Sequence, residues 1–324
     1  MTRDRIRLVE AAALVAGLTL SGTCPAQNER VFPEPEPSGI QPDDQGAEMD
    51  YGLTAGEYWF DLWSEFSPSG ELGDGDVQTW RTGAELGAMY PLGPRDRLWI
   101  QFRSEYTNSD FKNIDEFVPD GDLYNSLLEY TLSVTSTTAI SDRWSVLLRA
   151  SGTSAGEAHA DFDETVTFRG VVGAAYTINS NLQIGLAAAM GTRLEEDTAF
   201  VPLPLIDLQY EIDEQWRVEL RSFTGLKVTY APAPALDLSL RATWEYTEYR
   251  MDHDGPFAGG VFRELRVPVM LEADWKLHPQ FVLTGSIGLN LLREWEFDDD
   301  NGNKFFSTSV NNDMVLGLGL TYRF

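Results

Sequence analysis

The chain has 324 residues and a formal net charge of -27, with 24 Lys and Arg against 51 Asp and Glu. A charge this negative repels phosphates, so nucleic acid is not an expected partner. The single cysteine, Cys24, excludes a disulfide framework and a cysteine-ligated zinc site. Because 43% of the residues are hydrophobic and 12% aromatic, the chain is too apolar for a disordered acidic protein. Its length fits one large β domain or two ordinary ones.

The first 26 residues have the features of a secretory signal peptide. Three arginines precede the short apolar stretch 11–20, and a small-residue cleavage site follows at 24–26. A lipid-modified Cys24 is the alternative. Residues 27–53 are rich in proline and acid and are expected to form a disordered linker, with a partner-binding segment as the alternative. No later segment approaches the ~20 consecutive apolar residues of a spanning helix, so we expect no helical membrane anchor.

From Glu57 onward, apolar and polar residues alternate with the period of a β-strand, most clearly over 236–246. No ten-residue window has a convincing helical period. The pattern predicts an all-β protein with fourteen strands, at about 57–66, 77–90, 98–107, 124–136, 144–154, 165–178, 182–193, 201–212, 216–223, 226–231, 236–250, 261–276, 281–297 and 312–324.

Most of these strands are longer than the usual ~5–6 residues and suit a membrane-spanning strand of ~9–11. Short connections at 91–97, 179–181, 213–215, 232–235 and 278–280 alternate with long ones at 67–76, 108–123, 154–164, 251–260 and 297–304. Short turns on one side and long loops on the other are typical of a transmembrane antiparallel up-and-down β-barrel, with the turns periplasmic and the loops extracellular.

The strand number depends on residues 216–230, which alternate without interruption. A three-residue turn with a bulge at Thr224-Gly225-Leu226 divides them into a hairpin and gives fourteen strands. Twelve strands, with residues 57–66 outside the barrel wall, is the alternative. Whether the first strand joins the wall or folds into the lumen as a plug is left open by the sequence.

Aromatic residues cluster where the strands meet the short turns, as in the girdle of a membrane barrel. They are Tyr90, Trp99, Trp144, Tyr176, Tyr210, Trp216, Tyr230, Trp275, Phe281, Tyr322 and Phe324. The last residues, with Leu318, Leu320, Tyr322 and Phe324 in alternation, resemble the end of bacterial outer-membrane β-barrel proteins. The resemblance, which extends to a family of uncharacterised outer-membrane barrels, implies that these four residues form the signal for the barrel-assembly machinery and that the protein lies in the bacterial outer membrane.

Charged residues of both signs occupy the opposite, lumen-facing positions. We predict lumen and selectivity residues at Arg81, Glu85, Arg103, Glu105, Glu129, Arg149, Arg169, Arg217, Arg221, Arg241, Glu245, Arg266 and Glu272, with further charges at Asp207, Glu219, Lys227, Asp237, Glu264 and Asp274. Fourteen strands are wide enough for a water-filled lumen, although rows of opposite charge can also plug it with salt bridges. Trp59 and Trp63 face inward and either narrow the bore or pack structurally.

The predicted loops, including 193–199, each carry a net negative charge, which favours cations at the mouth or simply keeps the loops soluble. The segment 298–303 has its glycine in the wrong place for a calcium loop. Catalysis is disfavoured: His159, His253 and His278 are the only histidines, and Asp252-His253-Asp254 is the one candidate base with an orienting carboxylate.

These observations predict a monomeric, non-enzymatic barrel in contact with outer-membrane lipid that passes small solutes by diffusion, without a cofactor, metal site or catalytic residue. A non-conducting barrel that binds ligands through its outer loops is the alternative. A soluble carbohydrate-binding β-sandwich is disfavoured because apolar outward faces repeat on nearly every strand.

Overall fold

The computed structural model describes residues 56–114, 122–179, 182–194, 196–221, 225–254, 256–300, 302–311 and 313–324. The predicted signal peptide and linker lie outside the described residues. Nothing helical within those ranges has the length and apolar character needed to cross a membrane.

The described residues form sixteen β-strands and one short 3₁₀ helix. They are β1 (Glu57–Leu72), β2 (Gly75–Pro91), β3 (Arg97–Lys112), β4 (Ser126–Ala139), β5 (Trp144–Glu157), η1 (Phe162–Glu164), β6 (Val166–Asn179), β7 (Leu182–Arg193), β8 (Glu196–Glu211), β9 (Trp216–Arg221), β10 (Gly225–Ala233), β11 (Leu236–Ala242), β12 (Glu245–Arg250), β13 (Val261–His278), β14 (Phe281–Asp298), β15 (Lys304–Asn311) and β16 (Met314–Arg323).

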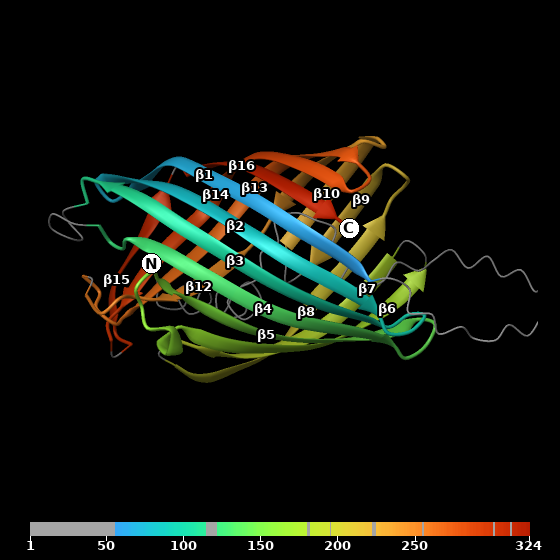
Figure 1. Ribbon diagram of the computed structural model, residues 1–324, viewed down its shortest axis with the longest axis horizontal. Coiled ribbons are helices and arrows are strands. Elements are labelled where there is room, and N and C mark those ends of the chain that lie inside the picture. Colours follow the sequence, from blue (N-terminus) through green and yellow to red (C-terminus); the bar gives the residue numbers. More distant parts are fainter. Residues whose placement is uncertain are drawn as a thin grey trace, which may run out of the picture.

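The strands close into one antiparallel up-and-down barrel of fourteen wall strands (Figure 1). The sixteen strands make fourteen wall positions, because two positions are each shared by two strands. β11 and β12 pair successively with β13, and β15 and β16 pair successively with β14. β1 pairs with β2 on one side and with β16 on the other, from Trp59 opposite Arg323 to Phe66 opposite Leu316. The first strand therefore belongs to the wall and closes the barrel.

The predicted hairpin within 216–230 is present, but the predicted turn position is wrong, because Gly225 and Leu226 are already paired within β10. β9 and β10 are antiparallel, with Trp216 opposite Tyr230 and Arg221 opposite Gly225. Gly225 has φ +86°, a left-handed conformation that glycine adopts without steric cost. The residues between the two strands, 222–224, lie outside the described residues. The hairpin and the place of β1 in the wall exclude the twelve-strand alternative.

The connections predicted to be short turns all lie at one end of the barrel, which we call the turn end, together with residues 57 and 323. At the other end, the loop end, two of the predicted long connections are wrong. Residues 67–76 are mostly strand, because β1 and β2 extend into a hairpin that turns at Gly73. Residues 193–199 lie mostly in β7 and β8. Long excursions occur after β3, β5 and β12, and shorter ones after β14.

The outer face of the barrel is apolar around its circumference. Large side chains such as Leu86, Leu132, Leu186, Leu271 and Leu318 are more than half exposed. At the turn end, neighbouring rings on adjacent strands form the predicted aromatic girdle, except that Trp99 is wrongly included, because it shares the inward parity of the buried Gln101 and Arg103. Ring centroids lie 5.0 Å apart for Trp144 and Tyr176, 4.6 Å for Trp216 and Tyr230, and 4.6 Å for Phe281 and Tyr322. Amphipathic rings at this height suit a membrane interface.

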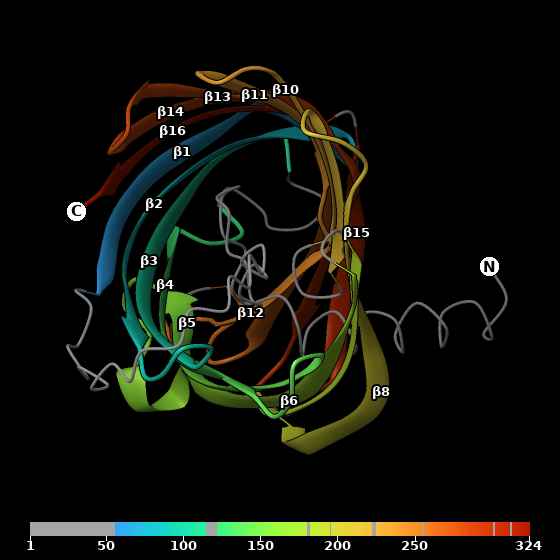
Figure 2. The same ribbon diagram turned by 90° about the vertical axis from the view of Figure 1, so that its right-hand side faces the viewer.

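At the loop end, β12 leaves the circular wall and crosses the bore. Figure 2, a view along the barrel, shows β12 inside the ring of wall strands. Arg250 of β12 pairs in parallel with Gly156 of β5, although the five strands β6 to β10 separate β5 from β11 in the wall. The strands β1–β5 and β12–β15 therefore enclose a smaller ring at this end, and β6–β8 lie beside it.

Candidate functional site: the lumen

The predicted lumen residues fall into two groups that differ in burial. The buried group consists of Arg81, Glu85, Arg103, Glu105, Glu129, Arg241, Glu245, Arg266 and Glu272, joined by Asp237 and Glu264. Arg149, Arg169 and Arg217, with Glu219, Lys227 and Asp274, are only half-buried. Arg221 and Asp207 are placed by their backbones alone, opposite each other on β9 and β8. The half-buried arginines all come from β5, β6 and β9.

Ion pairs connect the buried group across strands that are not neighbours. Arg81 on β2 pairs with Glu264 on β13, and β1, β14 and β16 lie between these strands in the wall. Arg266 on β13 likewise reaches Glu65 on β1, with 3.0 Å between Nη1 and Oε2, and also pairs with Glu245. Such contacts span the bore and fill its cross-section on this side.

The buried arginines of this network either have more than one acidic partner or share an acidic partner with another cation. Glu105 accepts from Arg103 at 2.6 Å and from Arg81 at 3.4 Å. Arg293, which the sequence analysis did not assign to the lumen, pairs with Glu264 at 2.8 Å and with Asp313 at 2.9 Å. Because a buried charge is tolerated only when it is paired and hydrogen-bonded, this network specifies one packing of the side chains.

Closer to the turn end, two tryptophans of β1 lie flat on glycines of β2. Trp59 is opposite Gly87 and Trp63 is opposite Gly83, and a methyl group on either glycine would overlap the indole ring. Trp59 Nε1 donates to Glu85 at 3.1 Å, and the Arg103 guanidinium lies 4.7 Å from the centre of the Trp63 ring. The rings are thus packed against the inner wall.

At the loop end the smaller ring is filled by a hydrophobic cluster. It consists of Leu72, Val77, Phe111, Ile114, Leu123, Tyr124, Leu127, Ala155, Tyr249, Met251, Phe257, Phe262, Trp295, Phe297 and Val310. Its rings come from strands on different sides of the bore: Phe262 stacks on Tyr124 with centroids 5.2 Å apart and on Phe297 with centroids 4.7 Å apart. Trp295 connects the cluster to the ion pairs by donating to Glu264 at 3.0 Å. The cluster closes this part of the bore.

The middle of the wall formed by β6 and β7 is different, because its lumen-facing side chains are small. Six of them pair across the two strands as Val171 with Ala189, Gly173 with Ala187, and Ala175 with Gly185. Their large neighbours in sequence, such as Val172 at 54% exposure and Leu186 at 61%, point outward. Bulky lumen-facing residues gather instead on β1, β2, β13 and β14.

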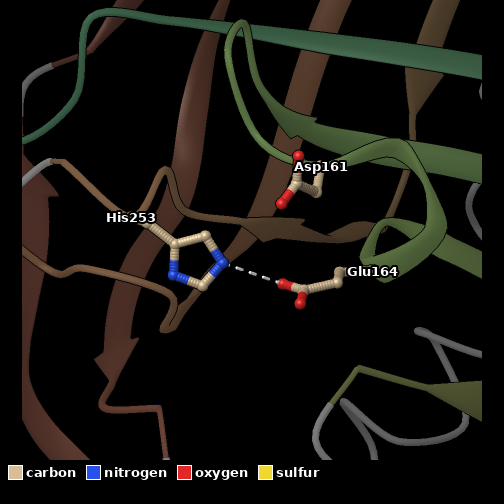
Figure 3. A group of neighbouring side chains, drawn as sticks. All are labelled: Asp161, Glu164 and His253. Atoms are coloured by element: carbon tan, nitrogen blue, oxygen red, sulfur yellow. Dashed lines mark hydrogen bonds and ion pairs between the residues drawn. The ribbon is translucent and has the colours of Figure 1, made fainter.

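The loops at the loop end bring together residues that the sequence analysis treated separately. His253 Nε2 lies 3.2 Å from Glu164 Oε2, and Asp161 lies beside them (Figure 3). The acid that His253 contacts is 89 residues away and is neither Asp252 nor Asp254, the carboxylates that the sequence analysis considered for it. Nothing in the local sequence indicates this, because the two loops meet only where β12 crosses to β5.

The C-terminal residues occupy the wall where the barrel closes. Leu318, Leu320 and Phe324 are exposed on the outer face, and Tyr322 lies half-buried between Phe281 and Phe324. The Phe324 amide donates to Tyr58 O at 2.9 Å, which fastens the end of the chain to the first strand.

A closed barrel satisfies every strand edge, and its apolar belt with an aromatic girdle matches the hydrocarbon and interface of a bilayer. The protein is therefore a transmembrane β-barrel of the bacterial outer membrane. Residues 95–323 match the family described as Domain of unknown function (DUF6268), and the chain belongs to this family. No curated protein matches it.

Several solved barrels are similar to this chain in structure. An outer membrane channel from Pseudomonas putida F1 has 14% identity and a TM-score of 0.45, with 86% of this chain and 100% of that chain covered. The toluene transporter TodX of P. putida has 10% identity and a TM-score of 0.42, with coverages of 82% and 89%. The KdgM porin has 7% identity and a TM-score of 0.35, with coverages of 82% and 99%.

Proposed function

We propose that this barrel is a passive channel for small solutes whose conduit runs along the β6–β7 side of the lumen. One observation carries the proposal: β6 and β7 present the small side chains of Val171, Gly173, Ala175, Ala187 and Ala189 to the lumen, whereas ion pairs and aromatic rings gather on the side of β1, β2, β13 and β14. The half-buried Arg149, Arg169 and Arg217 border this side.

The charges along this route suggest how it discriminates between solutes. Exposed acids at the loop end, including Asp74, Asp161, Asp163 and Asp254, are expected to concentrate cations. Two acids of the loops predicted to form the mouth have partners inside the protein. Glu157 accepts hydrogen bonds from the amides of Asn125 and Asp252, and Asp298 is buried against Arg263. The arginines farther inside oppose cations, so we propose a weak cation preference that the arginines limit.

Cysteine modification tests the position of the conduit. After removal of the predicted signal peptide the chain contains no cysteine, so single cysteines can be introduced one at a time. Ser133 and Ser151 lie opposite each other on β4 and β5, but Ser133 is buried at 3% exposure and Ser151 is half-buried. The proposal predicts steady conductance in planar bilayers, and a charged thiosulfonate reagent should reduce it in Ser151→Cys. Ser133→Cys is the matched control and should react at least roughly tenfold more slowly.

The aromatic cluster and the ion pairs favour a second candidate, a non-conducting barrel that binds partners through its outer loops. Absence of conductance from protein that is folded and inserted would support this candidate and contradict the channel. We also propose that the protein is a monomer without catalytic activity, and that Leu318, Leu320, Tyr322 and Phe324 are recognised by the barrel-assembly machinery.

A further inference from the structure

Three side chains with metal-binding groups converge at the loop end of the barrel. Asp161 and Glu164 lie at the start and end of η1, between β5 and β6, and His253 lies in the loop between β12 and β13. One ligand atom from each lies within 4.8 Å of the other two. Figure 3 shows the imidazole and the two carboxylates directed toward one another.

The backbone holds these side chains close together before any ion arrives. Asp161 and Glu164 are three residues apart on a 3₁₀ turn, where side chains at this spacing lie on the same face. The His253 ring rests against Gly259, which has φ +68° and at which a Cβ atom would lie only 3.0 Å from the ring. The site therefore combines a short turn with a ring whose position is supported from behind.

Contacts away from the ligand atoms join the two loops. Arg250 donates from Nε to Glu164 O at 3.3 Å and from Nη1 to Gly259 O at 2.8 Å. The buried Glu157 carboxylate accepts from the Asp252 amide at 3.0 Å. Both contacts lie beside the pairing of β12 with β5, so the same inward crossing that narrows the bore brings His253 to η1.

We infer that Asp161, Glu164 and His253 form a binding site for a divalent transition-metal ion of the zinc class. An imidazole with two carboxylates is a donor set that zinc accepts, with metal–ligand distances of about 2.0–2.2 Å and a free position for water. Calcium and magnesium prefer six or more oxygen ligands, so the imidazole disfavours them.

Ligand atoms in a tetrahedral zinc site lie about 3.4 Å apart, given metal–ligand distances of about 2.1 Å. Separations of up to 4.8 Å therefore require the ligand atoms to approach one another by up to about 1.4 Å. His253 and Glu164 have 56% and 42% of their side-chain surface exposed, so neither is locked by packing. A bound ion would tie the β12–β13 loop to the β5–β6 loop and hold β12 across the bore.

The test is calorimetric titration of the folded, detergent-solubilised mature protein, purified without a histidine tag, with zinc chloride. We expect one saturable equivalent per chain, with affinity lowered about tenfold or more in His253→Ala and in Glu164→Gln. Asp163→Asn removes an exposed acid from the same turn, and His278→Ala removes an exposed histidine at the turn end, so both should bind within about twofold of the unmodified protein.

A second measurement reports on the ligands themselves. Cobalt bound in place of zinc should show visible ligand-field absorption that His253→Ala abolishes and His278→Ala retains. Heat-modifiable electrophoretic mobility confirms that each variant is folded. Absence of saturable zinc binding, or equal binding by His253→Ala, would overturn the inference. Neither measurement depends on whether the barrel conducts.

Discussion

Replacing Gly83 by alanine tests the packing of tryptophan against the inner wall. The new Cβ atom would lie 2.1 Å from Trp63 Cζ2 and 2.7 Å from the Ser104 carbonyl oxygen, so the ring must move. Trp63 is 6% exposed and lies beneath the Arg103 guanidinium, which leaves it little room to move without losing this contact.

The expected cost follows from two contributions. Overpacking in a filled interior costs about 1–3 kcal/mol, and a cation–π contact contributes about 0.5–2 kcal/mol. Because the ring can shift rather than leave, we expect the free energy of unfolding to fall by about 2–3 kcal/mol in total, an equilibrium change of about 30- to 150-fold.

The assay is denaturant unfolding of the barrel in detergent micelles or vesicles, followed by tryptophan fluorescence and by electrophoretic mobility. Gly285→Ala is the matched control, since a methyl group at Gly285 on β14 meets nothing within 4 Å. It should change stability by about 0.5 kcal/mol or less. In a Trp63→Ala background, Gly83→Ala should cost less than it does alone. Equal unfolding midpoints for Gly83→Ala and Gly285→Ala would refute the reasoning.

The remaining predictions concern the ion pairs, the outer face, the conduit and the metal. Glu264→Gln removes the charge shared by Arg81 and Arg293 and should destabilise the barrel by about 3–5 kcal/mol; Lys304→Met, at an exposed pair, should cost about 1 kcal/mol or less in the same unfolding assay. Leu318→Asp places a charge on the lipid face and should lower the amount of folded protein in the outer membrane, whereas Leu92→Asp in an exposed turn should not; equal amounts would contradict a lipid-facing Leu318. Arg169→Gln should raise the cation preference measured from the reversal potential across a salt gradient, and an unchanged potential would exclude Arg169 from the conduit. Zinc at about 100 times its dissociation constant should stabilise the unmodified protein by about 2.7 kcal/mol and His253→Ala by about 1.4 kcal/mol or less in a thermal melt, and equal stabilisation of both would place the bound ion elsewhere.

The barrel was predictable because a strand that separates lipid from lumen must alternate, and alternation is visible in a single sequence. The segment 236–246 shows it most clearly, and its outward residues Leu238 and Leu240 are exposed as predicted. The hairpin at Gly225 followed from a topological argument, namely that the loops must exit on one side. The loop lengths were harder to predict than the strands. In 67–76 the alternation weakens around Pro68 and Gly70, yet β1 and β2 continue beyond the expected membrane span.

The contents of the lumen were only half predictable, since alternation shows which side chains face inward but not which of them meet. Arg81 and Glu264 are 183 residues apart, and their contact depends on how far β13 approaches β2 across the bore. The same limit hid Arg293, whose neighbours Leu292 and Glu294 gave no clear inward parity near the shift in register around Arg266 and Pro268.

The crossing of β12 shows why the rules of strand pairing in a barrel wall do not predict the meeting of His253 with η1. Thr243 and Trp244 interrupt the strand between β11 and β12, and after this break β12 follows β13 but no longer β10 within the described residues. Once free of β10, its apolar Tyr249 packs against Phe262 in the cluster, and Arg250 reaches β5. Burial of these rings offsets the lost strand pairing, since an aromatic side chain buries about 150–250 Å². The narrowed bore and the meeting of His253 with η1 are therefore both consequences of one break in one strand.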